Sequence, residues 1–453
     1  MTQNSNCEEV IKPNSVRQLH LKQFKERKSV FTELSKTKHF LTVKHLFYCI
    51  LFGLLLKDVA FNFILNKKVD YGLRSIMFGY AKFHIFLILW YLIFTLNVLT
   101  FTFYNLWVTI RKKCLIRSLN TLWVDCIFFC LLIGYYIGSL YGVPVLIRIF
   151  NLPILSAGSL LTEQVRLIMK SYSFIRRNVP EVLNYKPHRD KKIFQPKFSH
   201  YIYFLFVPTL IYRHKYPRTK SINWNTAIHC FLEVIVCIWL QSYTMDYFFV
   251  KKFETIGIIK HDWSYVIIVI LEGAIGGFLL VVLLCYQLLH NWMNGFAEIL
   301  KFGDRKFYDD WWTATNFQTF FRKWNIIVQD WLYEYIYKDF SEKVTVNNKV
   351  IPKIMVFLVS AIVHEYILTV ITQQFFPFLF VNFFIFGMIF SFLNTKHIVY
   401  NILFLYGLSF GFSLNVSFYT MESFARKNCH VEYNTTSQFL PRIFSSQCIN
   451  ALQ

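Results

Sequence analysis

Charged residues are scarce in this chain, and acidic residues most of all. Only 16% of the 453 residues are charged, and 48 Lys and Arg stand against 26 Asp and Glu. Soluble domains carry about 25% charged residues. Apolar runs without charge recur, and 55% of the chain is hydrophobic. Such runs are typical of membrane-spanning segments. A soluble protein with one large core is therefore excluded.

The motifs of several soluble enzyme classes are also absent. The sequence contains no P-loop, no dinucleotide-binding glycine fingerprint and no G-x-S-x-G elbow. Asp309 and Asp310 lack the spacing of a calcium loop, and His290 is not part of a zinc pattern. We therefore expect no metal site and no bound cofactor.

The apolar runs do not alternate polar with apolar residues, as the strands of a membrane barrel would. Lipid offers no partner for free backbone groups, so the spans must then be helices. We predict an all-α, polytopic transmembrane bundle of 8–9 spans. The candidate spans are residues 43–65, 83–106, 121–142, 226–249, 264–288, 353–374, 375–393 and 398–420, with a weaker ninth at 146–165.

The formal net charge of +22 is spread between these runs. Lys and Arg in such loops orient the helices and contact anionic headgroups, and no compact basic domain for nucleic acid is present. We expect residues 1–42 to form a basic cytosolic segment without a cleavable signal peptide. Residues 43–420 would form the membrane domain, and residues 421–453 a luminal tail.

The tail carries two isolated cysteines, Cys429 and Cys448, beside the glycosylation sequon at residues 434–436. Together these features suggest an oxidising lumen and a disulfide. Two free thiols are the alternative.

One titratable residue, His364, lies inside the apolar run 354–371. A polar ring buried at that depth is costly unless the protein uses or satisfies it. Histidine can accept and return a proton near neutral pH, so His364 is the candidate general base. Ser360 shares its helical face, whereas Glu365 points about a quarter-turn away and would support the ring indirectly or pair with another helix. A structural histidine bonded to a carbonyl is the alternative.

Residues 289–352 are too polar to span a membrane and too aromatic to be disordered. They predict short helices at the membrane surface. Within this block, the neutral amide of Asn325 could donate to a developing oxyanion, and Trp324 beside it could exclude water. An interfacial residue that faces solvent is the alternative for Asn325.

Two motifs resemble a known family. Residues 303–312, which include Phe-Tyr-Asp-Asp-Trp-Trp, resemble the FYxDWWN motif of the sterol acyltransferase branch of the membrane-bound O-acyltransferases. Residues 360–366 resemble the catalytic-histidine helix of that branch. Weaker similarities lie at residues 163–166, 208–213 and 216–218, and residues 418–448 resemble the family's luminal tail with its disulfide.

The resemblance implies an endoplasmic-reticulum sterol O-acyltransferase with an intramembrane reaction chamber, which self-associates as a dimer or tetramer. It would move a fatty acyl group from acyl-CoA, a co-substrate rather than a cofactor, to the sterol 3β-hydroxyl. His364 would be the base and Asn325 the active-site asparagine. The residues expected to line the acyl-CoA tunnel are Tyr308, Trp312, Arg322, Tyr333, Tyr337, Lys349 and Ser360.

Two positions depart from the family pattern: Thr313 replaces the motif's final asparagine, and Gln329 replaces a histidine. The first would alter a packing role and the second one coenzyme contact. The diacylglycerol acyltransferase sibling is the nearest alternative, but it usually has proline where this chain has Ile327, and it lacks the paired cysteines. A non-enzymatic transporter would need a polar conduit, whereas the polar residues here concentrate at one helix and one interfacial block.

Overall fold

The computed structural model describes residues 21–67, 71–116, 120–186, 195–259, 262–345, 348–393, 395, 397–429 and 441–444. These residues form an all-α fold, in which the only strand-like pairing is three isolated bridges. The α-helices are α1 Val30–Leu34, α2 Lys38–Asn66, α3 Arg74–Gly79, α4 Phe83–Ile116, α5 Leu122–Ile149, α6 Ile154–Leu183, α7 Phe198–Phe206, α8 Trp224–Met245, α9 Lys251–Phe253, α10 Trp263–Leu284, α11 Met293–Ile299, α12 Phe317–Lys323, α13 Ile326–Leu332, α14 Val350–Thr372, α15 Phe378–Phe380, α16 Gly387–Phe392 and α17 Val399–Asn428.

Wider π-helical turns continue several of these helices, and two short 3₁₀ segments complete the set. The π segments are η1 Asp246–Val250, η2 Cys285–Trp292, η4 Tyr333–Tyr337, η5 Phe340–Val344 and η6 Val381–Phe386. The 3₁₀ segments are η3 Trp311–Thr313 and η8 Arg442–Phe444. Short helices therefore build residues 311–344, as the composition of the aromatic block predicted; their depth in a membrane stays a prediction.

Seven helices in the described ranges are long and apolar enough to cross a membrane. They coincide with seven of the predicted spans and confirm a multi-pass membrane protein. The run 375–393 is instead a shorter apolar stretch, Phe378–Phe392, divided among α15, η6 and α16. The ninth span, 146–165, is wrong: the chain turns at Asn151, whose φ is 45°, and Pro153 is the N-cap residue of α6. The predicted run thus joins the end of one helix to the start of another.

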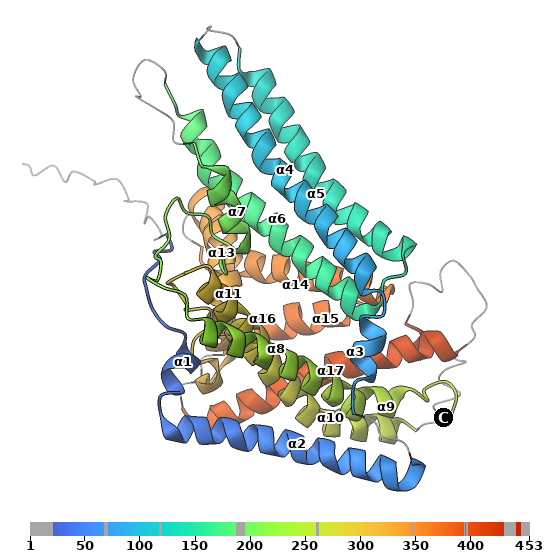
Figure 1. The fold of residues 1–453 in the computed structure, drawn as a ribbon. Helices are drawn as coiled ribbons and strands as arrows, with labels where there is room; N and C mark the ends of the chain where they lie inside the picture. Colours follow the sequence, from blue (N-terminus) through green and yellow to red (C-terminus); the bar gives the residue numbers. More distant parts are fainter. Residues whose placement is uncertain are drawn as a thin grey trace, which may run out of the picture.

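The helices α4, α5 and α6 run side by side along one flank of the molecule (Figure 1). The side chain of Lys170 on α6 is buried there, and its Nζ donates to the carbonyls of Phe204, Leu205 and Val207 at 2.7, 3.0 and 2.7 Å. Three acceptors match the three N–H donors of an ammonium group, which also complements the carbonyl end of α7. Lys170 therefore fixes α7 and the loop after it on α6.

A second group contains α8, α10 and α17. A Cβ added at Gly277 of α10 would lie 2.5 Å from the Ser409 carbonyl oxygen of α17, and one at Gly273 would lie 2.5 Å from Ser413 Oγ. Ser413 Oγ donates to the Ile270 carbonyl at 3.0 Å. Small residues allow such close approach between membrane helices, so α10 and α17 pack almost backbone to backbone.

The end of α17 holds the C-terminal tail. The Glu422 side chain is fully buried, and its carboxylate accepts from Arg426 Nε at 2.7 Å and from the backbone N–H groups of Arg442 and Ile443 at 2.9 and 3.1 Å. Cys429 is disulfide-bonded. Cys448 and the sequon lie outside the described residues, so the Cys429–Cys448 pairing and glycosylation stay predictions.

We expect Glu422→Ala to release η8 from α17, because the half-buried Arg442 N–H and the buried Ile443 N–H lose their acceptor. Each such group costs about 1–3 kcal/mol, so the melting temperature of the purified protein should fall by several degrees, and the tail should become sensitive to protease. Glu272→Ala is the control, because Glu272 is 55% exposed and pairs with Lys252 at 3.4 Å. Equal melting temperatures for the two variants would contradict this role of Glu422.

Candidate functional site

The first component of the site is His364, in the second half of α14. Its Nδ1 lies 2.7 Å from the Ser360 carbonyl oxygen. A carbonyl only accepts, so Nδ1 must carry the proton, and the lone pair is then on Nε2. This is the tautomer that a general base at Nε2 needs. The carbonyl bond also belongs to the structural alternative, so the distinction between the two roles rests on Nε2.

The expectation that the His364 side chain is buried is wrong. The side chain is exposed in the isolated chain, whereas Ala361 and Glu365, which flank it on one side of α14, are buried. The helix packs on α6, η4 and η6, and although Phe383 of η6 lies beside the ring, the His364 side chain stays exposed. Apolar sequence around a residue does not decide which face its neighbours cover, and here the ring remains accessible to a second molecule.

Glu365 points away from His364 and joins α14 to two other segments. Its carboxylate accepts from the Phe380 N–H at 2.9 Å and from the Tyr419 hydroxyl of α17 at 3.1 and 3.2 Å. The prediction that Glu365 pairs with another helix is confirmed. Its role is to fix the rotation of α14, which in turn sets the direction of the His364 side chain.

Aromatic rings connect His364 to the interfacial block. The Phe383 ring lies 5.6 Å from the His364 ring and 5.5 Å from that of Phe321 on α12, between ring centroids. Phe357 on α14 packs against both phenylalanines, at 5.2 Å from Phe321 and 5.9 Å from Phe383. The segments α12, α14 and η6 therefore meet beside the histidine.

Asn325 is the N-cap residue of α13, a role that no sequence pattern had predicted. Its Oδ1 accepts from the Val328 N–H at 3.2 Å, as cap residues typically do. Its Nδ2 has no hydrogen-bond partner within the described residues. The cap thus fixes the amide plane and leaves two N–H donors for a ligand. Trp324 packs edge-on against Trp311, with ring centroids 4.9 Å apart.

The motif at residues 307–313 forms a tight turn against α12. The Asp309 N–H donates to the Lys323 carbonyl at 2.8 Å, and Lys323 Nζ lies 2.8 Å from Asp310 Oδ1. Thr313, which replaces the family's asparagine, donates through Oγ1 to the Asp310 carbonyl at 2.7 Å. This hydrogen bond between two residues of the motif closes the turn. The Thr313 side chain is otherwise exposed.

The residues predicted to contact acyl-CoA fall into two sets. Tyr308 has no exposed surface; its hydroxyl lies 2.8 Å from His290 Nδ1 and accepts from the Phe31 N–H at 3.2 Å. Trp312 is half-buried and stacks on Phe31, with ring centroids 4.9 Å apart. Both side chains are thus part of the protein scaffold.

The other predicted contacts lie on more open surfaces. Tyr333 and Tyr337 stack on each other along η4, which packs against α14. Ser360 and Gln329 are half-buried, and Arg322 and Lys349 are exposed. Contact of any of these residues with acyl-CoA stays a prediction. In the described ranges, no three His, Cys, Asp or Glu side chains are grouped to hold a metal ion.

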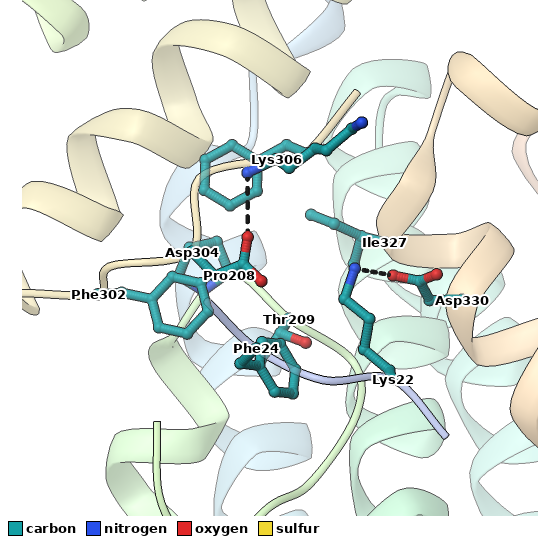
Figure 2. A pocket seen from close by; sticks show the side chains of 10 residues that line it. Lys22, Phe24, Pro208, Thr209, Phe302, Asp304, Lys306, Ile327 and Asp330 are labelled. Atoms are coloured by element: carbon teal, nitrogen blue, oxygen red, sulfur yellow. Dashed lines mark hydrogen bonds and ion pairs between the residues drawn. The ribbon is translucent and has the colours of Figure 1, made fainter. Parts of the chain in front are cut away.

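A small cavity lies where the N-terminal segment crosses this block (Figure 2). Lys22 pairs there with Asp330 of α13 at 2.5 Å, and the side chains of Phe24 and Asp304 line the same space. Burial raises the pKa of Asp330 above its ordinary value, against the opposing effect of Lys22. These contacts were not predictable from the sequence, since no local pattern links residue 22 to residue 330.

The chain is similar in sequence to known membrane-bound O-acyltransferases. Residues 153–421 match the membrane-bound O-acyltransferase family. The chain is 33% identical to sterol O-acyltransferase 1 of Mus musculus over 433 residues, which are 94% of this chain and 79% of the mouse protein. It is 35% identical to sterol O-acyltransferase 2 of Mus musculus, over 91% of this chain and 78% of that protein. It is 32% identical to sterol O-acyltransferase 2 of Homo sapiens, over 89% of this chain and 76% of the human protein. The matched region includes both the motif turn and α14.

Proposed function

Because this chain belongs to the membrane-bound O-acyltransferase family, we propose that it is an acyl-CoA-dependent sterol O-acyltransferase. The substrates are a long-chain fatty acyl-CoA and a sterol, and the products are a steryl ester and free CoA. Identity to sterol O-acyltransferases over nearly the whole chain supports the sterol as acceptor. The observation that carries the chemistry is the His364 ring, which is exposed and held at Nδ1 by the Ser360 carbonyl.

In the proposed reaction, Nε2 of His364 takes the proton of the sterol hydroxyl as its oxygen attacks the thioester carbonyl. The new C–O bond forms, the C–S bond breaks, and the leaving thiolate takes the proton back from the imidazolium. Holding the alcohol and the thioester together supplies a large part of the rate. Excluding water prevents hydrolysis of the thioester. No acyl-enzyme is needed, so the transfer is direct.

Asn325 is the group we assign to the acyl-CoA carbonyl oxygen. The cap holds its amide plane, so Nδ2 is pre-oriented to donate where negative charge develops. We expect Asn325→Ser to lower kcat by about 10²-fold or more, because serine keeps a capping oxygen and loses the NH₂ group.

The matched control for this variant is Asn223→Ser. Asn223 caps α8 in the same way, with Oδ1 accepting from the Thr226 N–H at 3.1 Å. Both variants should melt close to the wild type, and only the first should lose steryl ester formation. Equal activities would remove Asn325 from the catalytic set.

We also propose that the protein resides in the endoplasmic-reticulum membrane and associates as a homodimer or tetramer. The cysteine-containing tail with its sequon supports an oxidising lumen on one side. CoA is polyanionic and water-soluble, so it would approach from the cytosolic side, near the aromatic block. The sterol and the acyl chain would come from the bilayer.

An acceptor assay tests the function directly. Membranes containing the protein are given labelled oleoyl-CoA with either a sterol or a diacylglycerol. We expect labelled steryl ester and little labelled triacylglycerol. Predominant triacylglycerol would favour the sibling activity, and no labelled ester with either acceptor would favour a non-enzymatic membrane protein.

A further inference from the structure

The N-terminal strap, residues 22–34, crosses the motif turn far from its own place in the sequence. The Arg27 N–H donates to the Gly303 carbonyl at 3.0 Å, and the Arg305 N–H donates to the Arg27 carbonyl at 3.1 Å. Arg27 also forms a two-point ion pair with Asp304, with Nε–Oδ1 at 2.6 Å and Nη2–Oδ2 at 3.0 Å. Backbone and side chain thus hold the same three residues, 303–305.

Asp304 makes this pairing strong and specific. Its side chain is 3% exposed, whereas that of Arg27 is 35% exposed. The carboxylate also accepts from the Lys25 and Lys306 N–H groups at 3.3 and 3.4 Å, but a buried carboxylate that loses its cation keeps an uncompensated charge. The planar guanidinium of Arg27 satisfies both oxygens at once, as a lysine does not. The N-terminal strap therefore supplies the positively charged partner of the buried Asp304 carboxylate.

The C-terminal part of the strap, at Ser29 and Phe31, is also held in place. The Phe31 ring stacks on Trp312 with an interplanar angle of 10°, and the Phe31 N–H donates to the Tyr308 hydroxyl. Ser29 is buried, and its Oγ lies 3.2 Å from His290 Nδ1. The two ends of residues 303–312 are thus held by Arg27 and by Phe31.

The segment that the strap holds also contacts Ile326, the first residue of α13. The Ile326 N–H donates to the Phe307 carbonyl at 3.0 Å, and Ile326 follows Asn325 directly. Lys22 pairs with Asp330 on the same helix at 2.5 Å (Figure 2). A continuous set of contacts therefore runs from the strap, through residues 304–307, to the amide that caps α13.

We propose that Arg27 is a positioning residue for the reaction, which acts through Asp304 and Phe307 to hold the Asn325 amide. This rests on the proposed function. The strap holds the site in its working geometry, so loss of the Arg27 pair lowers kcat and leaves the acyl-CoA KM nearly unchanged.

The test uses the full-length protein in lipid nanodiscs with Arg27→Ala, Arg27→Lys and the exchanged pair Arg27→Asp with Asp304→Arg. We expect kcat for steryl ester to fall at least 10-fold in Arg27→Ala, by less in Arg27→Lys, and to recover partly in the exchanged pair. Lys36→Ala is the control, since Lys36 lies near the strap but pairs with the exposed Glu33. Unchanged kcat in Arg27→Ala, or a loss confined to KM, would overturn the proposal.

Amide hydrogen exchange separates this inference from the proposed function. The N–H groups of Ile326 and Val328 should exchange at least 5-fold faster in Arg27→Ala than in Lys36→Ala, whatever the acceptor of the enzyme is. Should Arg27→Ala fail to fold, Arg27→Lys is compared in its place. Unchanged exchange at these two amides would disprove the coupling, whereas faster exchange in a protein that makes no steryl ester would sink only the proposed function.

Discussion

Replacing His364 with alanine is expected to abolish measurable steryl ester formation, with a fall in rate of about 10²–10⁴-fold. The reason is local: the exposed ring keeps a lone pair on Nε2, since its other nitrogen is bonded to the Ser360 carbonyl. The measurement is the transfer of label from oleoyl-CoA to sterol in reconstituted membranes, with released fatty acid counted separately.

The variant should melt like the wild type, because the His364 side chain is exposed and alanine favours a helix. His84→Ala, on the exposed side of α4, is the matched control. Ester synthesis at the wild-type rate by the His364 variant would eliminate the general-base assignment. Loss of synthesis together with loss of folding would return His364 to the structural alternative.

Glu365→Ala should lower the stability of the protein, whereas His364→Ala should lower activity without lowering stability. The Phe380 N–H would lose its acceptor inside the protein, whereas the Tyr419 hydroxyl would lose Glu365 and keep the Phe376 carbonyl, at 2.9 Å. At about 1–3 kcal/mol for an unsatisfied group, the free energy of unfolding should drop by about 1–3 kcal/mol. Activity should fall with it, since α14 is then free to rotate. Thermal melting of purified protein measures the first effect, and ester formation the second.

Glu365→Gln is the informative control. The remaining amide oxygen can take the place of Oε2, which accepts from both Phe380 and Tyr419, and the new NH₂ group can donate to Thr369 Oγ1. We therefore expect a melting temperature near that of the wild type. A glutamine variant as unstable as the alanine variant would mean that the negative charge is required, and a stable alanine variant would contradict the anchoring role altogether.

The spans were predictable because hydrophobic length alone forces a helix across a bilayer. The break at Asn151 was not, since the flanking run 146–165 remains apolar through it, and the turn depends on one left-handed residue before Pro153. His364 stood out as a candidate base because of its apolar setting, but its exposure depends on which helices pack around α14. That is a property of tertiary packing, which a single run of sequence does not contain.

The aromatic block illustrates the same limit. Asn325 was found as a polar residue among aromatics, yet its cap role depends on where α13 begins. The Arg27–Asp304 pair joins residues 277 positions apart, and both look like ordinary surface charges in the sequence. Tyr308 belongs to a motif that suggested ligand contact, whereas its hydroxyl meets Phe31 and His290. Local patterns identified the segments, and only the fold assigned partners within them.

The near contact of α10 and α17 has a consequence for how a sterol can travel. With Gly277 so close to the Ser409 carbonyl that a single methyl group would collide, no ring system can pass between these two helices at that level. The interface between α10 and α17 is therefore closed to a lipid there. A lipid that moves sideways from the bilayer toward the histidine must use a different gap, and bulky substitutions designed to map that route belong on other helix pairs.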